Sequence, residues 1–485
     1  MSGVYPKNLG AKIQQISNYS NNYVKLNPNN SLTELVNTSS GGSISIDLPP
    51  NSLVDLSTLS IHLDFSTTPG VDGADGCRSY TLSRYAQSLI RLIRVEIGGS
   101  VVSEISDYNL IHQIMADYQF GIEGSSKKLQ HNYDPLAVRD NAGDPINPVF
   151  NIPTASPVRV KYCQRHLVWN QFLGFLGGAS STKYIDTGIT GNVRITIETA
   201  PASHCLILGA DHVLANRHRT GLAAGTGPAI TQAPNYTLSN IFATIKKVQI
   251  DDGVYFNALS QSLASGIPFQ YHFNSFVNTK SSATNGNITM RMELSSGSVS
   301  MAFLTFLSST GSTIGPLPDI VNLSRDGLTA DGVVIKHKSA KGYSLDGVLN
   351  CFCSNYFKRT GVGIDSINWS INGERSPMFK LTNAIVYDKL MSDMGIHDDT
   401  GNGIYYGITS YQSWLENYYV ASLRLSHVCD DPSFISGLNS QGIPLTLEAE
   451  TSAPAGGGAD KIAMMTVMTD NILQVYAGRQ INLVR

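Results

Sequence analysis

Charged side chains are scarce in this sequence. They make up 15% of the 485 residues, against roughly 25% in an average soluble protein. Uncharged polar side chains such as Ser, Thr and Asn cost less to desolvate than Lys or Glu, so the composition fits a surface that becomes buried between subunits. Loop-rich β structure also favours Ser, Asn and Gly, and composition alone leaves both explanations open.

Positive charge is neither abundant nor clustered. The net charge is −3, and the first thirty residues carry only Lys7, Lys12 and Lys25. Binding to a phosphate backbone by counterion release needs a dense Lys/Arg patch or arm, and the segment Arg217-His218-Arg219 is too small to supply one. We therefore expect no direct binding to nucleic acid.

The sequence also lacks a cysteine framework and long apolar runs. The chain does not open on a charged-then-apolar signal segment, so we expect its scattered cysteines to be reduced thiols. The strongest apolar run, 301–307, is far shorter than the roughly 18 residues that cross a bilayer, so no membrane-spanning helix is expected. The cysteines are Cys77, Cys163, Cys205, Cys351, Cys353 and Cys429.

Motifs that carry chemistry are few and weak. No Gly-x-x-x-x-Gly-Lys-Ser/Thr loop and no Gly-x-Ser-x-Gly elbow occurs. Cys351-Phe352-Cys353 has the wrong spacing for a zinc knuckle and fits two core thiols on one strand face. His204-Cys205 near Asp211-His212 is a Cys/His pair, but sequence neighbours seldom make nucleophile–base geometry. His397-Asp398-Asp399 suits calcium chemically, although a solvated acidic turn is favoured. We predict no catalytic residue, no metal site and no cofactor.

What the sequence does contain is material for large cores. Apolar residues make up 42% of the chain, with 16 Phe and 22 Tyr. A chain of this length exceeds a single ordinary core, so two or three domains are expected.

Apolar residues alternate with polar ones along several segments, as half-buried strands require. The pattern is clear at 44–48 and 59–65, and further strands are predicted at 92–97, 193–197 and 240–250. Gly-, Pro- and Asn-rich loops separate them, which is typical of a β-sandwich.

Two segments have helical spacing instead and are predicted to pack against a sheet. The first follows the Gly98-Gly99 turn, and the second follows residues 251–253. Their apolar positions are Ile105, Tyr108, Ile111 and Met115 in the first, and Tyr255, Leu259 and Leu263 in the second.

Four landmarks recur in the same order in both halves of the sequence, which predicts that the second half repeats the fold of the first. In both halves a two-residue turn, Gly98-Gly99 or Asn372-Gly373, closes a hairpin before a helix, since such residues take positive φ at both central positions. The first landmark is a pair of strands, at 44–48 and 59–65 in the first half and at 288–292 and 301–307 in the second. The second landmark is a hairpin followed by a helix, with the hairpin at 94–100 in the first half and at 368–374 in the second, where the helix is expected over 381–394. The third and fourth landmarks are strands, at 191–198 and 239–244 in the first half and at 442–448 and 470–475 in the second.

This order predicts an all-β fold of two tandem eight-stranded jelly-roll sandwiches, a double jelly roll with a few short helices in its loops. The predicted parts are an N-terminal arm over 1–40, which gains order only from neighbours, a first jelly roll over 41–252, a linker helix within 253–269 and a second jelly roll over 270–485.

Four segments carry a family resemblance: 47–59, 236–240 leading into 248–251, 436–445 and 475–483. They resemble the first hairpin, the strand closing the first roll and the final strands of the double jelly-roll major capsid proteins of icosahedral double-stranded DNA viruses. The resemblance includes the virophage and polinton-like virus members of this family. The likeness spans most of the chain and consists of strand and turn texture.

The resemblance implies a structural protein and no enzyme. It implies a homotrimer that forms a pseudo-hexameric capsomer and tiles into an icosahedral shell around a double-stranded DNA genome. Its partners would be neighbouring capsomers, a penton or vertex protein, minor capsid proteins and an internal membrane. Its location would be the virion, assembled inside the host cell.

The alternative is a lectin-like, carbohydrate-binding β-sandwich, such as a viral attachment protein. The aromatic residues Tyr405-Tyr406, Trp414 and Tyr418-Tyr419 would then be stacking platforms for sugars. Aromatic residues at this density more often fill cores or subunit contacts, which favours the capsid interpretation.

Overall fold

The fold is described here from a computed structural model of the chain. The structure describes residues 19–30, 34–37, 42–67, 80–82, 86–119, 164–177, 184–208, 235–250, 253–283, 287–308, 355–357, 359–394, 411, 414–415, 418–426, 437–439, 445–452 and 461–484.

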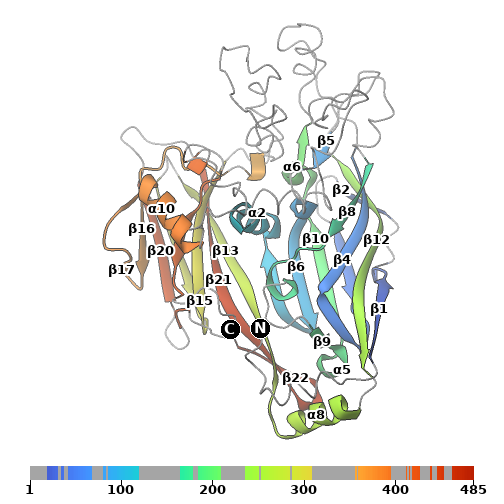
Figure 1. Cartoon of the computed structure of the whole chain (residues 1–485). Coiled ribbons are helices and arrows are strands. Elements are labelled where there is room, and N and C mark those ends of the chain that lie inside the picture. Colours follow the sequence, from blue (N-terminus) through green and yellow to red (C-terminus); the bar gives the residue numbers. More distant parts are fainter. Residues whose placement is uncertain are drawn as a thin grey trace, which may run out of the picture.

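The described residues of the first half form twelve strands, and the sandwich that they build lies on the right in Figure 1. They are β1 (Tyr19–Leu26), β2 (Glu34–Asn37), β3 (Ser43–Asp47), β4 (Leu53–Thr67), β5 (Tyr80–Leu82), β6 (Ile90–Ile97), β7 (Ser100–Ser106), β8 (Gln164–Trp169), β9 (Tyr184–Asp186), β10 (Val193–Thr199), β11 (Leu206–Leu208) and β12 (Tyr236–Ile250). One sheet has the order β1-β12-β4-β8, with β2 on β12 and β9 on β4. The facing sheet has the order β3-β10-β6-β7, and β5 pairs with β11.

The second sandwich lies on the left in the same view (Figure 1). Its strands are β13 (Phe269–Ala283), β14 (Ile288–Leu294), β15 (Val299–Ser308), β16 (Ser366–Ile371), β17 (Glu374–Arg375), β18 (Leu381–Thr382), β19 (Ala421–Arg424), β20 (Leu445–Ser452), β21 (Lys461–Tyr476) and β22 (Gln480–Val484). One sheet has the order β13-β21-β15-β19, with β22 on β21. The other has the order β14-β20-β16-β17, with β18 on β16.

Both sandwiches have jelly-roll topology. The eight main strands of the first sandwich are numbered in chain order, with β1 and β2 counted together as the first and the short strands β5, β9 and β11 left out. Its two sheets then have the orders one-eight-three-six and two-seven-four-five. The second sandwich has the same two orders when β18 and β22 are left out. The predicted fold class is therefore confirmed. The four sequence landmarks fall on equivalent strands, which are β3 with β14 and β4 with β15, β6 with β16, β10 with β20, and β12 with β21.

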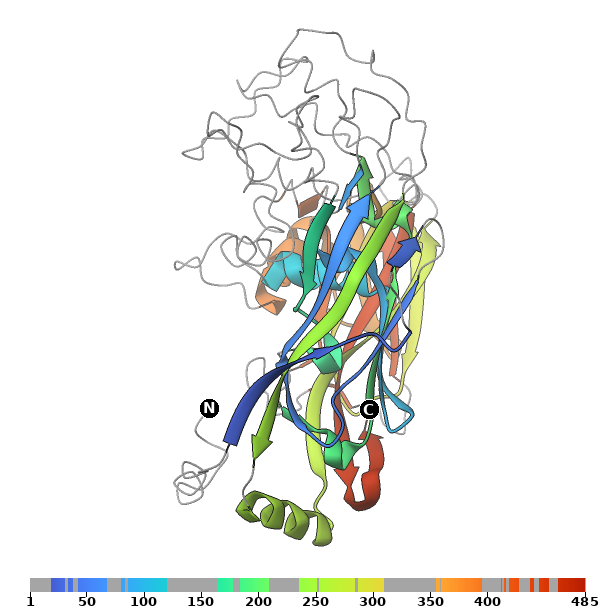
Figure 2. The same ribbon diagram turned by 90° about the vertical axis from the view of Figure 1, so that its right-hand side faces the viewer.

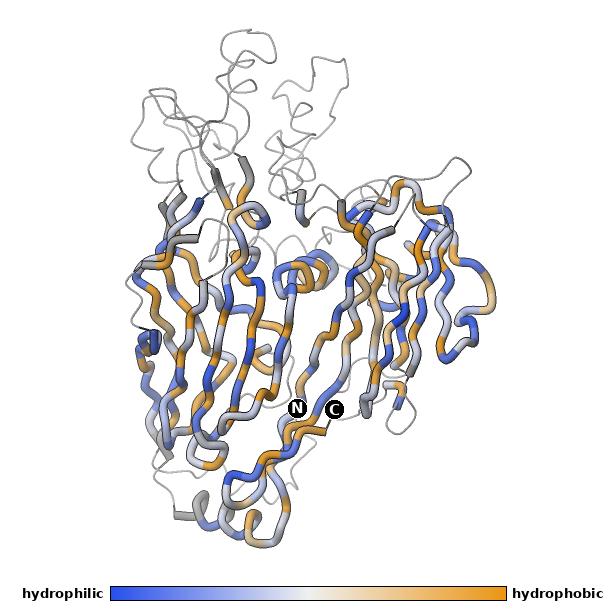
Figure 3. The backbone as a smooth tube through the Cα atoms, turned by 180° about the vertical axis from the view of Figure 1, so that it is seen from behind, coloured by the Kyte–Doolittle hydropathy of each residue, from blue (hydrophilic) through white to orange (hydrophobic). Residues whose placement is uncertain are grey.

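Alternating burial explains why these segments are strands. In β3 the residues Ile44 and Ile46 are buried while their neighbours are not. In β14 every second residue from Ile288 to Leu294 is buried. The period of two places one apolar row on the inner face of each sheet. Figure 3 shows apolar and polar residues alternating along the strands of both sandwiches.

The helices are short, and several follow turns that the sequence predicts. The Gly98-Gly99 turn has φ of 58° and 86°, and Asn372-Gly373 has φ of 51° and 84°, which is the geometry of a tight hairpin turn. Among the described residues, no helix is both long and apolar enough to cross a bilayer. The helices are η1 (Ala86–Leu89), α2 (Tyr108–Gln119), η2 (Gly174–Leu176), α5 (Thr187–Thr190), α6 (Ala202–Cys205), α8 (Gly253–Ala264), η4 (Asn355–Phe357), α10 (Asn383–Asp393) and η6 (Ala477–Arg479).

Helix α8 joins the two sandwiches and lies below the sheets in Figures 1 and 2. Its described side chains are exposed or half-exposed. The helix is predicted correctly, but the prediction that it packs against a sheet is wrong. Because α8 must lead from the end of β12 to the start of β13, it spans the gap between two sheets and covers neither.

Part of the predicted N-terminal arm belongs to the first sandwich. Strand β1 pairs antiparallel with β12 from Tyr19 opposite Ile250 to Leu26 opposite Ala243, and β2 pairs with the other end of β12. Figure 2 shows β1 along the edge of this sheet. The prediction that residues 1–40 gain order only from neighbours is therefore wrong for these two strands, because backbone pairing orders them, although the described side chains of β1 are exposed or half-exposed.

We predict that removing residues 1–37 destabilises the chain whereas removing residues 1–18 does not. The longer deletion takes away β1 and β2 and leaves one edge of β12 unpaired. Because the entropy of unfolding grows with chain length, the unfolding midpoint of a chain of 485 residues is expected to fall by about 1 °C for each kcal/mol lost, as measured by differential scanning calorimetry. Equal midpoints for the two deletions would contradict the pairing.

Candidate functional site: the contact between the two sandwiches

Helix α2 lies between the two sandwiches (Figure 1). Every residue from Tyr108 to Tyr118 is buried, including the polar side chains of Asn109, Gln113 and Asp117. A helix that is buried on all its faces needs partners for each polar group. Part of that partnership comes from the second sandwich.

A buried ion pair joins α2 to the second sandwich. Arg359 Nη2 lies 2.6 Å from Asp117 Oδ2, and the two side chains are only 2% and 1% exposed. Gln113 Nε2 also donates to Asp117 Oδ1 at 3.2 Å. The backbone of Arg359 forms bridges to Leu307 and Tyr418, so the guanidinium is presented from the body of the second sandwich.

Further aromatic contacts join the two sandwiches, one beside the ion pair and one elsewhere along β13. The Tyr118 hydroxyl donates to the carbonyl oxygen of Tyr418, and burial raises the pKa of Tyr118. Phe175 meets Phe273 of β13 edge to face, with ring centroids 5.2 Å apart. Edge-to-face pairs add to the stabilisation that area burial provides. The two sandwiches therefore share a continuous hydrophobic core.

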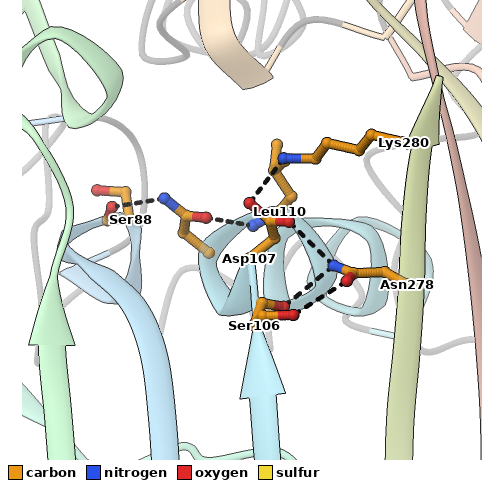
Figure 4. A network of polar contacts seen from close by, with 7 residues as sticks. Ser88, Ser106, Asp107, Leu110, Asn278 and Lys280 are labelled. Atoms are coloured by element: carbon orange, nitrogen blue, oxygen red, sulfur yellow. Dashed lines mark hydrogen bonds and ion pairs between the residues drawn. The ribbon is translucent and has the colours of Figure 1, made fainter.

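A second polar network lies where β7 ends against β13 (Figure 4). Asn278 Nδ2 donates to the Ser106 carbonyl oxygen at 3.1 Å, and Ser106 Oγ donates to Asn278 Oδ1 at 3.0 Å. Lys280 Nζ lies 2.6 Å from Asp107 Oδ1, while Asn278 Nδ2 is 3.2 Å from Asp107 Oδ2. Asn278 and Lys280 of β13 thus both contact the Ser106–Asp107 turn of the first sandwich.

The Cys/His pair that the sequence raised as a catalytic candidate, His204-Cys205, has the surroundings of structural residues. His204 stacks on Tyr356 of the second sandwich, with centroids 4.0 Å apart and planes 7° apart. Cys205 is a buried free thiol whose Sγ lies 3.4 Å from the Pro201 carbonyl oxygen. Burial raises the pKa of the Cys205 thiol, which disfavours the nucleophilic thiolate. Asp211 and His212 lie outside the described residues.

A histidine pair occupies the outer face of the first sandwich. His62 Nδ1 lies 3.2 Å from His166 Nε2, and His166 Nδ1 lies 2.9 Å from Asp64 Oδ1. Asn240 donates to the other Asp64 oxygen at 2.6 Å, which lowers the pKa of Asp64. Burial, and then the charge of His166, lower the pKa of His62, whose ring stacks on Phe242 at 4.8 Å.

Within the described part of the chain, no three His, Cys, Asp or Glu side chains are grouped so as to hold a metal ion. Residues 351–353 and 397–399, which the sequence raised as metal candidates, lie outside that part, as do Tyr405 and Tyr406. The other proposed sugar platforms are interior: Trp414, Tyr418 and Tyr419 are 0%, 4% and 0% exposed. They cannot stack on a sugar in this state.

Sequence reasoning missed the residues that join the sandwiches. Asp117 and Arg359 are 242 positions apart, and nothing local marks them as partners. One signal was available for Asp117, because the apolar positions of α2 leave Gln113 and Asp117 together on another face of the helix. From the sequence alone, a charged residue such as Asp117 beside an apolar stripe is expected to face solvent, because nothing in the sequence shows that a second sandwich covers it.

Two jelly rolls in tandem, joined through contacts of α2 and β13, define a double jelly-roll protein. The sequence matches no protein-family model and no curated protein. Its structure is nevertheless similar to known capsids. The capsid protein in the quasi-atomic PBCV-1 virus capsid has a TM-score of 0.54 at 11% identity, over 96% of this chain and 97% of that chain.

Two further structures show the same similarity. The Faustovirus major capsid protein has a TM-score of 0.54 at 11% identity, over 94% of this chain and 91% of its own. The Sputnik virophage structure gives 0.51 at 11% identity, over 96% and 88%. The similarity establishes that this chain has the double jelly-roll fold of these capsid proteins, as its sequence resemblance predicts.

We predict that breaking the buried ion pair from one side is costly. Asp117→Asn leaves the Arg359 charge without its counter-ion, and Arg359→Met does the converse. Each is expected to cost about 3–5 kcal/mol, measured by denaturant unfolding. The double variant Asp117→Leu/Arg359→Met should recover much of the loss, because no lone charge stays buried.

The matched control is Arg291→Ala, which breaks the exposed pair between Arg291 and Glu293, whose side chains are 58% and 63% exposed. Little change is expected there. Similar losses from the buried and exposed pairs would contradict the role assigned to Asp117.

We also predict an acid sensitivity that depends on His62. Its folded-state pKa lies below the ordinary value of 6.5, so the unfolded chain binds a proton more readily than the folded chain. Stability present above pH 6.5 should therefore fall on acidification. The wild-type chain should lose stability relative to His62→Gln between pH 7 and pH 5. A stability difference that is independent of pH would rule this out.

Proposed function

We propose that this chain is the major capsid protein of an icosahedral double-stranded DNA virus. In this proposal it is a structural and non-catalytic component of the virion, and three copies form a pseudo-hexameric capsomer. The observation that carries the proposal is the repetition of one jelly-roll topology within a single chain. A ring of three such chains contains six similar sandwiches, so a threefold tile acquires nearly sixfold contacts.

The composition supports the same role. With charged residues at 15%, the flanks of the chain can be buried against neighbours at a low cost of desolvation. Neighbouring capsomers would be the main partners, and a vertex protein, minor capsid proteins and an internal membrane would complete the shell.

We further propose a division of the chain into a first roll at 41–252, a linker at 253–269 and a second roll at 270–485. Strands β1 and β2 are added to the first roll. The position of α8 between β12 and β13 supports the linker.

The test is the assembly state of the purified chain. Sedimentation velocity is expected to give a trimer, and electron microscopy should show flat particles with a hexagonal outline that tile into sheets or shells. A chain that stays monomeric at high concentration and binds glycans would contradict the proposal and favour the lectin-like alternative.

A further inference from the structure

The two sandwiches use equivalent helices in different ways. Helix α2 follows the β6–β7 hairpin, and α10 follows β16, β17 and β18 at the same place in the second roll. While α2 is buried along its length, only Val386, Leu390 and Asp393 are buried in α10. The second sandwich contributes to the cover of α2 through Arg359, and nothing equivalent covers the outer side of α10 among the described residues.

Large apolar side chains are exposed at this place. Met378 is 92% exposed and Phe379 is 57% exposed in the segment between β17 and β18, and Ile385 of α10 is 38% exposed. We name these three residues the α10 face. Exposed apolar residues that are grouped beside one another commonly mark an interaction site.

The structure also shows what kind of surface covers such a face. Within the chain, β7, η2 and the Ser106–Asp107 turn that leads into α2 contact β13, the first strand of the second sandwich. The strands in the equivalent position of the first sandwich are β1 and β2, which pair with β12 as β13 pairs with β21. We name Tyr19–Leu26 and Glu34–Asn37 the β1 edge. It carries an exposed aromatic residue, Tyr23, at 71%.

The α10 face and the β1 edge lie on opposite sides of the molecule (Figure 1). A surface that contacts a different surface of the next copy forms a head-to-tail interface, which closes into a ring when the rotation allows. Self-pairing of either surface would not repeat the contact seen inside the chain.

We propose that the α10 face docks on the β1 edge of a second copy of this chain. The contact repeats between copies the one that joins the sandwiches within a copy. This inference rests on the proposed capsomer and names the two surfaces that hold it together. Three such contacts close the ring.

Charge placed on either surface tests the proposal. The variant Met378→Asp/Phe379→Asp alters exposed side chains only, so the folded chain should keep its unfolding midpoint and circular dichroism spectrum. In sedimentation velocity it is expected to run as a single chain under conditions in which the wild type is a trimer. Tyr23→Asp, on the opposite surface, is expected to weaken the trimer in the same way.

Ile267→Asp is the matched control, because Ile267 is 62% exposed in the turn after α8 and belongs to neither surface. It should remain trimeric. Dissociation of this control as well would overturn the assignment to the α10 face, since any added surface charge would then suffice. A double variant that stays trimeric would overturn the interface and leave the capsomer intact, whereas a monomeric wild type would overturn both.

A photoreactive benzoylphenylalanine at position 379 identifies the partner surface directly. After irradiation of the trimer, peptide mapping should place the cross-links between copies in residues 19–37. Cross-links confined to α8 or β22 of the second copy would overturn the pairing with the β1 edge.

Discussion

The buried ion pair between Asp117 and Arg359 fixes how the two halves of this protein sit together. Both charges have left water, and each is paired with the charge from the other sandwich, although Arg359 Nε is buried without a hydrogen-bond partner among the described residues. A docking that separated these two side chains while keeping either one buried would leave a charge buried alone, at a cost of about 3–5 kcal/mol. An apolar contact would tolerate sliding, whereas a bonded pair at 2.6 Å selects one docking. The relative orientation of the two sandwiches therefore depends strongly on one pair of side chains.

The other contacts gain their precision from that constraint. Once α2 is held, the Ser106–Asp107 turn faces Asn278 and Lys280, and Phe175 meets Phe273. These contacts are individually modest, because the pair between Lys280 and Asp107 is partly exposed to solvent. Together they extend the interface along β13. The linker α8 does not need to be rigid or buried, since the docking is determined elsewhere.

Much of the fold could be predicted from the sequence because the relevant physics is local. Alternating apolar residues mark β3 and β14, and the turns at Gly98-Gly99 and Asn372-Gly373 mark two hairpins before a helix. The order of the landmarks revealed the duplication because loop lengths differ between the halves while the strand sequence does not. An edge strand is the element that composition predicts least well. Strand β1 is rich in Asn and Tyr, and backbone pairing with β12 orders it without a buried apolar face.

The contact between the sandwiches could not be predicted, because its members are chosen by the docking and not by their neighbours in sequence. Asp117 is acceptable on a helix in water, and only the arrival of Arg359 makes it interior. The same reasoning explains the contrast between the equivalent helices. A duplicated fold presents each type of surface twice, but one chain can satisfy each contact only once. In the proposed ring, the exposed Met378 and Phe379 belong to the surface that one chain leaves uncovered. A tandem repeat whose two ends are complementary leaves one free surface of each kind, and a closed ring of copies would leave none.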